Sequence, residues 1–371
     1  MKLMFSITLV CFALTSFAQK KQYLLAGTYT NGKSTGVYVY DFDSKTGAAT
    51  VIDSIKTSNP SYLAVSTDKK FVYAVNEDAE PGVGGKVTAF SFDKQSGKLS
   101  ALNEQRSMGD HPCYITADKT GKWVIVGNYS SGTAAVLPVQ KDGSLGEAVS
   151  MVQHKGSSIN KQRQKSAHVH ATVLSPDNRF LFVPDLGIDK LMVYGFNVVN
   201  GELDSSKGRS VKLEDGSGPR HFDFHPNGRW AYLVQELAGT ITAFTYTKNG
   251  LAKFQRISTL PVGYNKPFSS ADIHVSKDGK FLYASNRDSS NTIAIFRIDP
   301  QSGRLSLVGH QSTLGKTPRN FNFDPAGNFL LVANQRSDAI VIFKRNAQTG
   351  LLRDTGKRIN IGSPVCIKWI D

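Results

Sequence analysis

Residues 216–246 read GSGPRHFDFHPNGRWAYLVQELAGTITAFTY and contain three short strand patterns separated by turns. In the first pattern Phe222 and Phe224 alternate with polar residues, which is typical of a strand with two distinct faces. A PNG turn leads into a mostly apolar strand that starts at Trp230. An AG turn then precedes a third strand rich in β-branched and aromatic residues. This stretch therefore predicts a unit of three consecutive antiparallel strands.

The unit recurs along the chain with a period near 50 residues. The aromatic residue that opens its second strand is found at Phe71, Trp123, Phe180, Trp230, Phe281 and Phe329. First strands are expected to begin at Pro60, Pro112, Val169, Pro219, Ser270 and Pro318. Repeats of this length, built from strands and tight turns, are typical of a β-propeller in which each copy forms one blade.

The two ends of the chain decide the number of blades. Residues 23–28 (YLLAGT) match a second strand that lacks a first, and residues 364–371 (PVCIKWID) match a first strand that lacks a second. Paired, they complete a seventh blade and close the ring, which covers the strand edges that the two half-blades would otherwise expose. The sequence therefore predicts an all-β fold, one seven-bladed β-propeller domain over residues 19–371, closed by its N- and C-terminal strands.

Residues 1–18 have the features of a secretory signal peptide: Lys2, an apolar core and a small-x-small cleavage site. We expect the mature chain to begin at Gln19 and to be exported to the periplasm or the medium, without a membrane span. Cys113 and Cys366 would then meet an oxidising compartment. Both lie in apolar strand patterns, where a free cysteine packs as a small hydrophobic residue, so we favour free thiols over a disulfide.

The formal net charge of +14 comes from basic residues scattered along the chain, many of them in turns. Nucleic-acid binding needs a concentrated basic patch, so this class of function is not expected. A diffuse positive field suits solubility, association with the cell envelope or attraction of anionic ligands. We expect a small anionic molecule as the partner, and a monomeric protein.

The repeat register predicts which side chains meet at one mouth of the central channel. First strands line the channel, and the loops that lead into them share a face with the loops that leave the second strands. The candidates at these positions are His111, His168, His170, Asp185, Arg220, His221, Glu236, Asp272, Arg287 and Arg319. Arg220 starts a first strand and Glu236 ends its paired second strand, so we expect the two to be neighbours. Arg287 holds the position of Glu236 one blade further on.

Several of these positions also have a structural interpretation. An asparagine recurs where second strands end, at Asn76, Asn128, Asn286 and Asn334, and such residues usually bind the loop backbone. Asp185 occupies the same register, and His221 and Asp272 are placed where side chains can turn into blade packing. The residues that depart from the repeat, Arg220, Glu236, Arg287 and the His168-x-His170 pair, are therefore the stronger functional candidates.

The two histidines lie on one face of one strand, which raises the alternative of a metal site with Asp185 as a third ligand. A His-x-His pattern alone is weak support for a metal, and no cysteine or acidic cluster accompanies it. We expect neither a metal nor another cofactor.

Five segments together are recognisable: HPCYITAD (111–118), AHVHATVLSPD (167–177), GSGPRHFDFHPNGR (216–229), SADIHVSKDGKFLYASNR (270–287) and TPRNFNFDPAGNFLLVAN (317–334). Their combination resembles the lactonase family of seven-bladed propellers, which includes the cycloisomerase-type 6-phosphogluconolactonases and is related to carboxy-muconate lactonising enzymes. The resemblance implies metal-free chemistry on a lactone ring. By this resemblance, the proposed catalytic histidine, two arginines and glutamate of the lactonising enzymes correspond to His168 or His170, Arg220 and Arg287, and Glu236.

These residue types suit the hydrolysis of a sugar lactone. Glu236 or a histidine would activate water, and Arg220 and Arg287 would stabilise the oxyanion and an anionic group of the substrate. The expected substrate-binding residues are His111, Asp185, His221, Asp272 and Arg319. Two alternatives stay open: a non-catalytic propeller that binds a ligand or protein in the cell envelope, and a cycloisomerase that forms lactones. Since 6-phosphogluconolactone is cytosolic, an exported relative would meet another lactone or sugar acid.

Overall fold

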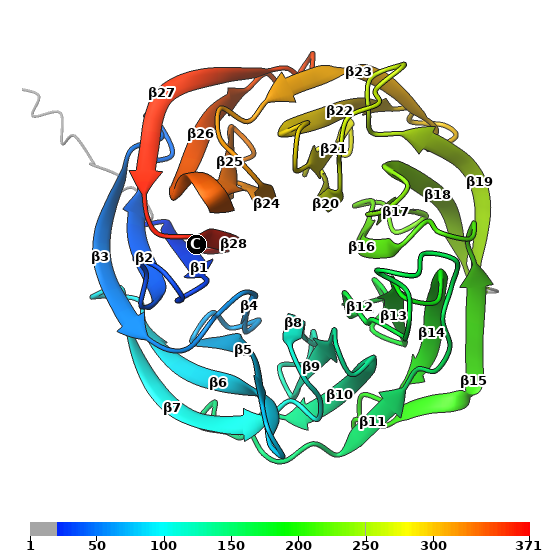
Figure 1. The fold of residues 1–371 in the computed structure, drawn as a ribbon. Helices are drawn as coiled ribbons and strands as arrows, with labels where there is room; N and C mark the ends of the chain where they lie inside the picture. The colour runs from blue at the N-terminus through cyan, green and yellow to red at the C-terminus, as the bar shows by residue number, and fades with distance from the viewer. Residues whose placement is uncertain (1–20, 249) are drawn as a thin grey trace, which may run out of the picture.

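The computed structural model describes residues 21–248 and 250–371. The predicted signal peptide and the predicted start of the mature chain at Gln19 lie outside the described residues. Seven four-stranded antiparallel sheets, formed by the described residues, are arranged as blades around a central axis (Figure 1). The prediction of an all-β, seven-bladed propeller is confirmed.

The strands run from the channel outward in each blade. Blade 1 contains β28 (Pro364–Ile370), β1 (Tyr23–Thr28), β2 (Gly36–Phe42) and β3 (Ala49–Lys56). Blade 2 contains β4 (Leu63–Val65), β5 (Phe71–Glu80), β6 (Gly84–Asp93) and β7 (Lys98–Arg106), and blade 3 contains β8 (Pro112–Ala117), β9 (Trp123–Asn128), β10 (Thr133–Pro138) and β11 (Ser150–Gln153). Blade 4 contains β12 (Val173–Leu174), β13 (Phe180–Asp185), β14 (Lys190–Phe196) and β15 (Leu203–Lys212).

The remaining three blades repeat this order. Blade 5 contains β16 (Pro219–Phe224), β17 (Trp230–Gln235), β18 (Thr240–Thr247) and β19 (Gly250–Ser258). Blade 6 contains β20 (Ser270–Val275), β21 (Phe281–Asn286), β22 (Thr292–Ile298) and β23 (Leu305–Ser312). Blade 7 contains β24 (Pro318–Phe323), β25 (Phe329–Asn334), β26 (Ala339–Arg345) and β27 (Leu352–Asn360), with a short 3₁₀ turn at Gln335–Ser337.

The ring closes through its two ends, as predicted. Strand β28 pairs antiparallel with β1, so that Tyr23 faces Ile370 and Ala26 faces Ile367. The last strand of the chain thus supplies the innermost strand of the first blade. Cys366, within this strand, and Cys113 are both buried free thiols, which agrees with the expectation that they do not form a disulfide.

All six aromatic residues predicted to open second strands do so, but two first strands begin later than expected. Instead of starting at Pro60, β4 starts at Leu63. Instead of starting at Val169, β12 starts at Val173, and Val169 makes only an isolated bridge. The opposite strand contains Pro184, which has no N–H group to continue the ladder.

The apolar core consists of the interfaces between neighbouring blades, where second-strand aromatics pack on turns of the next blade. Trp230, for example, lies against Gly303, which has a φ of +73°. A Cβ atom at this position would lie 2.5 Å from the indole ring, so only glycine allows this contact.

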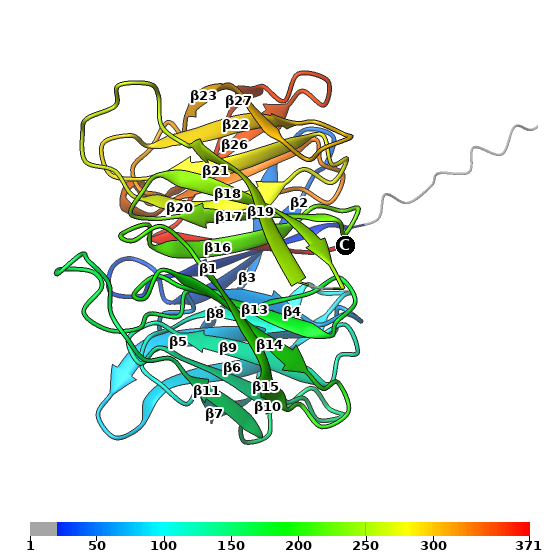
Figure 2. The ribbon, with the colours of Figure 1, turned by 90° about the vertical axis from the view of Figure 1, so that its right-hand side faces the viewer.

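The two faces of the ring differ in the loops they carry. Figure 2 shows the C-terminus on one face, while the loop after β11 and the loop after β19 extend from the opposite face. Within the described residues, no helix has the length and apolar character needed to cross a membrane.

Candidate active site

Glu236 lies at the centre of a buried cluster at the end of β17. Its carboxylate oxygen Oε2 accepts a hydrogen bond from Arg220 Nε at 2.8 Å and lies 3.0 Å from Arg287 Nη2. The other oxygen, Oε1, accepts a hydrogen bond from Arg163 Nη2 at 2.8 Å. Arg220, Glu236 and Arg287 therefore converge as the repeat register predicts, and Arg163 joins them. We call these four residues the arginine–glutamate cluster.

Two opposing effects act on the ionisation of Glu236. Burial by itself would raise the pKa of the carboxyl group, because it disfavours the charged form. The neighbouring Arg287, Arg220 and Arg163 outweigh burial and lower the pKa of Glu236 to about 2. Glu236 is therefore ionised at neutral pH, and a carboxylate of this low basicity is suited to orienting water rather than to accepting its proton.

Arg220 uses its donors within the protein. Besides the bond to Glu236, its Nη1 donates to His221 Nε2 at 3.2 Å and to the carbonyl oxygen of Ala271. Burial, followed by repulsion from Arg287, lowers the pKa of Arg220 to about 10, so the guanidinium stays protonated at neutral pH. Its side chain is only 2% exposed. Arg220 therefore holds the Glu236 carboxylate in place through its hydrogen bond to Oε2.

His221 and Asp272 form a hydrogen-bonded pair next to Arg220. Because a guanidinium can only donate, His221 Nε2 is the acceptor and the ring proton resides on Nδ1. This Nδ1 donates to Asp272 Oδ1 at 2.7 Å, and Asp272 Oδ2 accepts a hydrogen bond from His274 Nε2 at 3.1 Å. Burial and the positive charge of Arg220 lower the pKa of His221 to about 4, as expected for a neutral ring. Through its hydrogen bond with His221 Nε2, this buried pair fixes Nη1 of Arg220, while Nε of Arg220 binds Glu236.

The two histidines of the His-x-His pattern have different surroundings. His168 Nδ1 lies 3.0 Å from the carbonyl oxygen of Tyr129, and its ring stacks on the Tyr129 ring with centres 4.4 Å apart. His170 is buried, with Nδ1 3.6 Å from Cys113 Sγ and Nε2 3.9 Å from Glu236 Oε2. Burial, followed by nearby arginine and histidine side chains, lowers the pKa of His170 well below its usual range. His170 is thus a neutral imidazole beside the Glu236 carboxylate.

Asp185, considered from the sequence as a third metal ligand, uses both carboxylate oxygens elsewhere. Its Oδ1 accepts hydrogen bonds from the backbone N–H groups of His168 and Gly187, at 2.7 and 2.9 Å. Its Oδ2 lies 2.7 Å from His154 Nδ1. Across the described part of the chain, no group of three His, Cys, Asp or Glu side chains is arranged to bind a metal ion. Asp185 instead fixes the backbone that carries the histidine pair.

Arg319 and His111 lie apart from the arginine–glutamate cluster. The Arg319 guanidinium carbon lies 5.4 Å from the centre of the Tyr29 ring, and Nη2 is 3.8 Å from Glu77 Oε1. Glu77 Oε2 accepts a hydrogen bond from the Tyr29 hydroxyl at 2.8 Å. His111 Nδ1 lies 2.8 Å from Ser130 Oγ. Within the described residues, neither Arg319 nor His111 forms a hydrogen bond or ion pair with the cluster.

Arg163 is the member of the cluster that the repeat register does not predict. It lies in the loop between β11 and β12, and Asp189 anchors this loop by accepting hydrogen bonds from the side chains of Ser158 and Gln164. Asp189 also accepts a hydrogen bond from the backbone N–H of Gly218, in the loop that leads into β16. One buried carboxylate therefore positions two loops of the site. The only sequence signal for Arg163 is the unusually long interval between Trp123 and Phe180, since long ordered loops are often functional.

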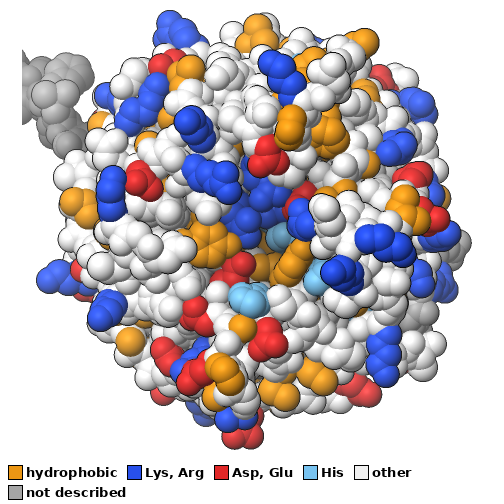
Figure 3. Space-filling view, viewed as in Figure 1, with side chains coloured by type: hydrophobic (Ala, Val, Ile, Leu, Met, Phe, Trp, Pro, Cys, Tyr) orange, Lys and Arg blue, Asp and Glu red, His pale blue; other side chains and the backbone are white. Residues whose placement is uncertain are grey.

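A depression of about 640 Å³ opens over the cluster. Its lining includes Arg163, Glu236, Arg287 and Asp288, with Lys266 from the loop after β19. Arg163 has 41% of its side chain exposed and Arg287 has 11%. Figure 3 shows the centre of this face as a hollow in which basic, acidic and histidine side chains gather. The arrangement presents cations to a ligand while Glu236 remains enclosed.

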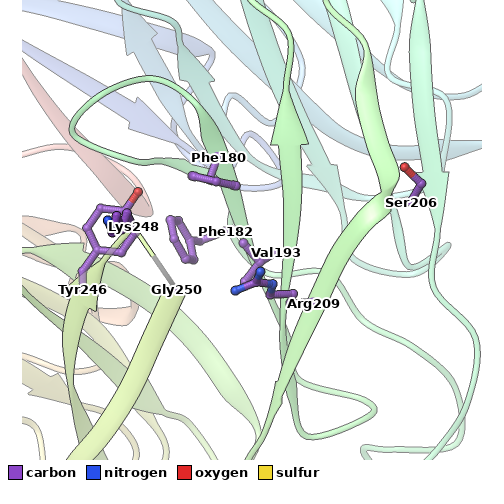
Figure 4. Close-up of a pocket in the computed structure, with 8 residues that line it drawn as sticks. All are labelled: Phe180, Phe182, Val193, Ser206, Arg209, Tyr246, Lys248 and Gly250. Atoms are coloured by element: carbon purple, nitrogen blue, oxygen red, sulfur yellow. The ribbon is translucent and has the colours of Figure 1, made fainter.

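A separate hollow of about 300 Å³ is lined by residues of blades 4 and 5. Phe180, Phe182 and Tyr246 lie together there, and the guanidinium of Arg209 points toward them (Figure 4). None of the predicted site residues lines it.

The family model described as "Lactonase, 7-bladed beta-propeller" matches residues 23–369. The chain belongs to this lactonase family. It is 39% identical over 334 residues to a 6-phosphogluconolactonase of Formosa agariphila, covering 89% of this chain and 94% of the relative. Among solved structures, it resembles a putative 6-phosphogluconolactonase of Bacteroides fragilis, with 40% identity, a TM-score of 0.90 and coverage of 96% and 99% of the two chains. A periplasmic gluconolactonase of Pseudomonas aeruginosa is 37% identical, with a TM-score of 0.89 and coverage of 95% and 99%.

The recurring asparagines of this lactonase-family chain bind backbone, as predicted. The Nδ2 atoms of Asn76, Asn128, Asn286 and Asn334 donate to the carbonyl oxygens of Ser58, Ser107, Thr259 and Thr313, respectively. Each of these bonds fixes the loop that precedes a first strand to the end of the paired second strand. The asparagines therefore shape the mouth, whereas the next register position supplies charge, with Glu77, Glu236 and Arg287.

Proposed function

We propose that the protein is a hydrolase that opens the ring ester of a sugar lactone at the arginine–glutamate cluster. The observation that carries the proposal is a buried carboxylate, held ionised by three arginines, beside a neutral imidazole and under an open depression. Lactones are activated esters, so an oriented water, a proton acceptor and fixed cations are sufficient for their hydrolysis. The names of the relatives, 6-phosphogluconolactonase and gluconolactonase, support a sugar lactone as the substrate class.

Glu236 and His170 divide the activation of water between them. Glu236 Oε2 and His170 Nε2 are 3.9 Å apart, so one water can contact both. Glu236, with a pKa of about 2, orients this water without taking its proton. The water oxygen adds to the lactone carbonyl carbon while His170 Nε2 accepts the proton, and the adjacent carboxylate stabilises the imidazolium. When the bond to the ring oxygen breaks, the imidazolium returns the proton to this oxygen and a hydroxy acid leaves.

The arginines have separate roles. Arg220 is a positioning residue, because its Nε and Nη1 donors are used by Glu236, His221 and Ala271. Arg163 and Arg287 line the depression, and these two guanidinium groups stabilise the oxyanion that develops on the carbonyl oxygen.

We also propose that the reaction is independent of metal ions and that it takes place outside the cytoplasm. The ring nitrogens His168 Nδ1 and His170 Nδ1 contact other protein groups, and both oxygens of Asp185 do so as well. The predicted signal peptide and the periplasmic relative support an exported enzyme that meets an extracytoplasmic lactone. We also propose that the protein acts as a monomer.

The proposal is tested by following ring opening of glucono-δ-lactone and 6-phosphoglucono-lactone as proton release at constant pH. We expect hydrolysis of at least one of them above the spontaneous rate. Arg287→Ala should lower kcat and raise KM, because Arg287 contacts both the ground state and the transition state. A folded protein that accelerates neither reaction would favour the non-catalytic alternative.

A further inference from the structure

Arg319 differs from the structural arginines of this protein. Its side chain is only 18% exposed, yet its guanidinium donates no hydrogen bond within the described residues, and the nearest carboxylate oxygen is 3.8 Å away. By contrast, Arg345 donates from Nε to the Tyr283 hydroxyl, from Nη1 to the Gly327 carbonyl and from Nη2 to Asp278. A largely buried guanidinium has five N–H donors to satisfy. Those of Arg319 are therefore left for a ligand.

Glu77 provides an acceptor next to these donors. Its Oε2 is occupied by the Tyr29 hydroxyl at 2.8 Å, whereas Oε1 has only the distant Arg319 as a partner. The Glu77 side chain is 14% exposed, so solvent or a ligand reaches it. The Tyr29 ring lies against the Arg319 guanidinium, and the Tyr29 hydroxyl fixes the orientation of the Glu77 carboxylate. The three residues thus present unused donors and an unused acceptor side by side.

This group lies on the opposite side of the channel mouth from the arginine–glutamate cluster. Tyr29, Glu77 and Arg319 come from blades 1, 2 and 7, whereas the cluster is built around blades 5 and 6 (Figure 1). The two groups use the same positions of the repeat: Arg319 holds in blade 7 the place of Arg220 in blade 5, and Glu77 holds in blade 2 the place of Glu236. Both groups therefore lie where first strands begin and second strands end, at the same mouth of the ring.

We propose that Tyr29, Glu77 and Arg319 form a second wall of the site that recognises the hydroxyl groups of a polyhydroxylated lactone. The inference rests on the proposed function and deepens it by naming what the substrate must carry. A hydroxyl both donates and accepts, so it can donate to Glu77 Oε1 and accept from Arg319. A phosphate cannot donate when ionised, and Glu77 repels its charge. This wall therefore selects the polyol part of the substrate.

The test compares glucono-δ-lactone with δ-valerolactone, which has the same ring and no hydroxyl groups. For E77Q we expect kcat/KM on glucono-δ-lactone to fall about 10- to 100-fold, the range for hydrogen bonds to charged groups. On δ-valerolactone the same variant should stay within about twofold of wild type. Y29F, which removes only the hydroxyl that orients Glu77, should show the same selectivity with a smaller loss. Glu104 is an exposed glutamate on β7 of the same blade. E104Q therefore serves as the matched control, and its kcat/KM should equal that of wild type on both substrates.

An equal loss on both lactones, or no loss on either, would overturn the second wall while leaving the proposed hydrolysis intact. If wild type hydrolyses neither lactone, the proposed function fails, and the wall is then judged from calorimetric binding of gluconate. In that case gluconate binding that is weakened in E77Q supports the wall, and the absence of binding or equal binding to both proteins overturns it. If E77Q does not fold, R319K and Y29F carry the same comparison.

Discussion

Replacing Glu236 with glutamine keeps the shape of the side chain and removes the charge that Arg163, Arg220 and Arg287 surround. The buried Arg220 would then face a neutral amide. The fall in the pKa of Glu236 from its ordinary value of 4.5 to about 2 corresponds to about 3 kcal/mol of stability at neutral pH. We therefore expect the free energy of unfolding of E236Q at pH 7 to be lower than that of wild type by about this amount.

The same ionisation predicts how this difference depends on pH. The pKa of Glu236 is lower in the folded than in the unfolded protein, so the stabilisation is fully present above about pH 4.5 and is lost as the pH falls toward 2. The gap in unfolding free energy between wild type and E236Q should be constant near neutral pH and shrink below about pH 4.5. Urea unfolding followed by tryptophan fluorescence at a series of pH values measures this gap.

Measuring kcat separates the catalytic role of Glu236 from its contribution to stability. At a temperature where both proteins are folded, the kcat of E236Q should be roughly a hundredfold lower than that of wild type, because a transition-state interaction is removed. Asn334→Ala is the control: its side chain holds the Thr313 carbonyl where the second strand of blade 7 ends, so this variant should lose stability and keep kcat. If E236Q is as stable and as active as wild type at pH 7, the assigned role of the cluster is refuted.

Three further outcomes are expected. Deleting residues 364–371 should expose the edge of β1 and cause aggregation or a large drop in Tm, and a monomeric truncated protein with unchanged melting would contradict ring closure. Intact-mass analysis of the exported protein should give a chain that starts at or near Gln19, and a retained leader would contradict this. Treatment with a chelator should leave the hydrolysis rate unchanged, and loss of activity together with bound zinc would overturn metal independence.

The fold could be predicted because its signals are local and repeated. Each blade carries an aromatic residue, a turn and an apolar strand at fixed spacing, and the incomplete ends at Tyr23 and Pro364 fit one another. The contact between Arg220 and Glu236 followed from hairpin geometry in the same way. The late starts of β4 and β12 escaped prediction, and for β12 the reason is the missing N–H of Pro184 on the opposite strand.

The chemistry of the site was less accessible to sequence reasoning. Arg163 lies outside the repeat, and its position depends on the hydrogen bonds of Asp189 to two loops. The use of Arg220 Nε and Nη1 within the protein and the unused donors of Arg319 follow from tertiary packing, which strand periodicity does not report. Two arginines with equivalent places in the repeat therefore have different roles.

The pairing of β28 with β1 has a consequence for biosynthesis. Tyr23 is made among the first residues of the blade it belongs to, whereas its partner Ile370 lies about 350 residues further along the chain. Blade 1 therefore stays without its innermost strand until β28 has been synthesised, however well the intervening blades have formed. Contacts between such distant residues form slowly, because a long stretch of chain must first be ordered. The delay keeps the emerging polypeptide incomplete until its last strand is available, a state compatible with the export predicted from its leader.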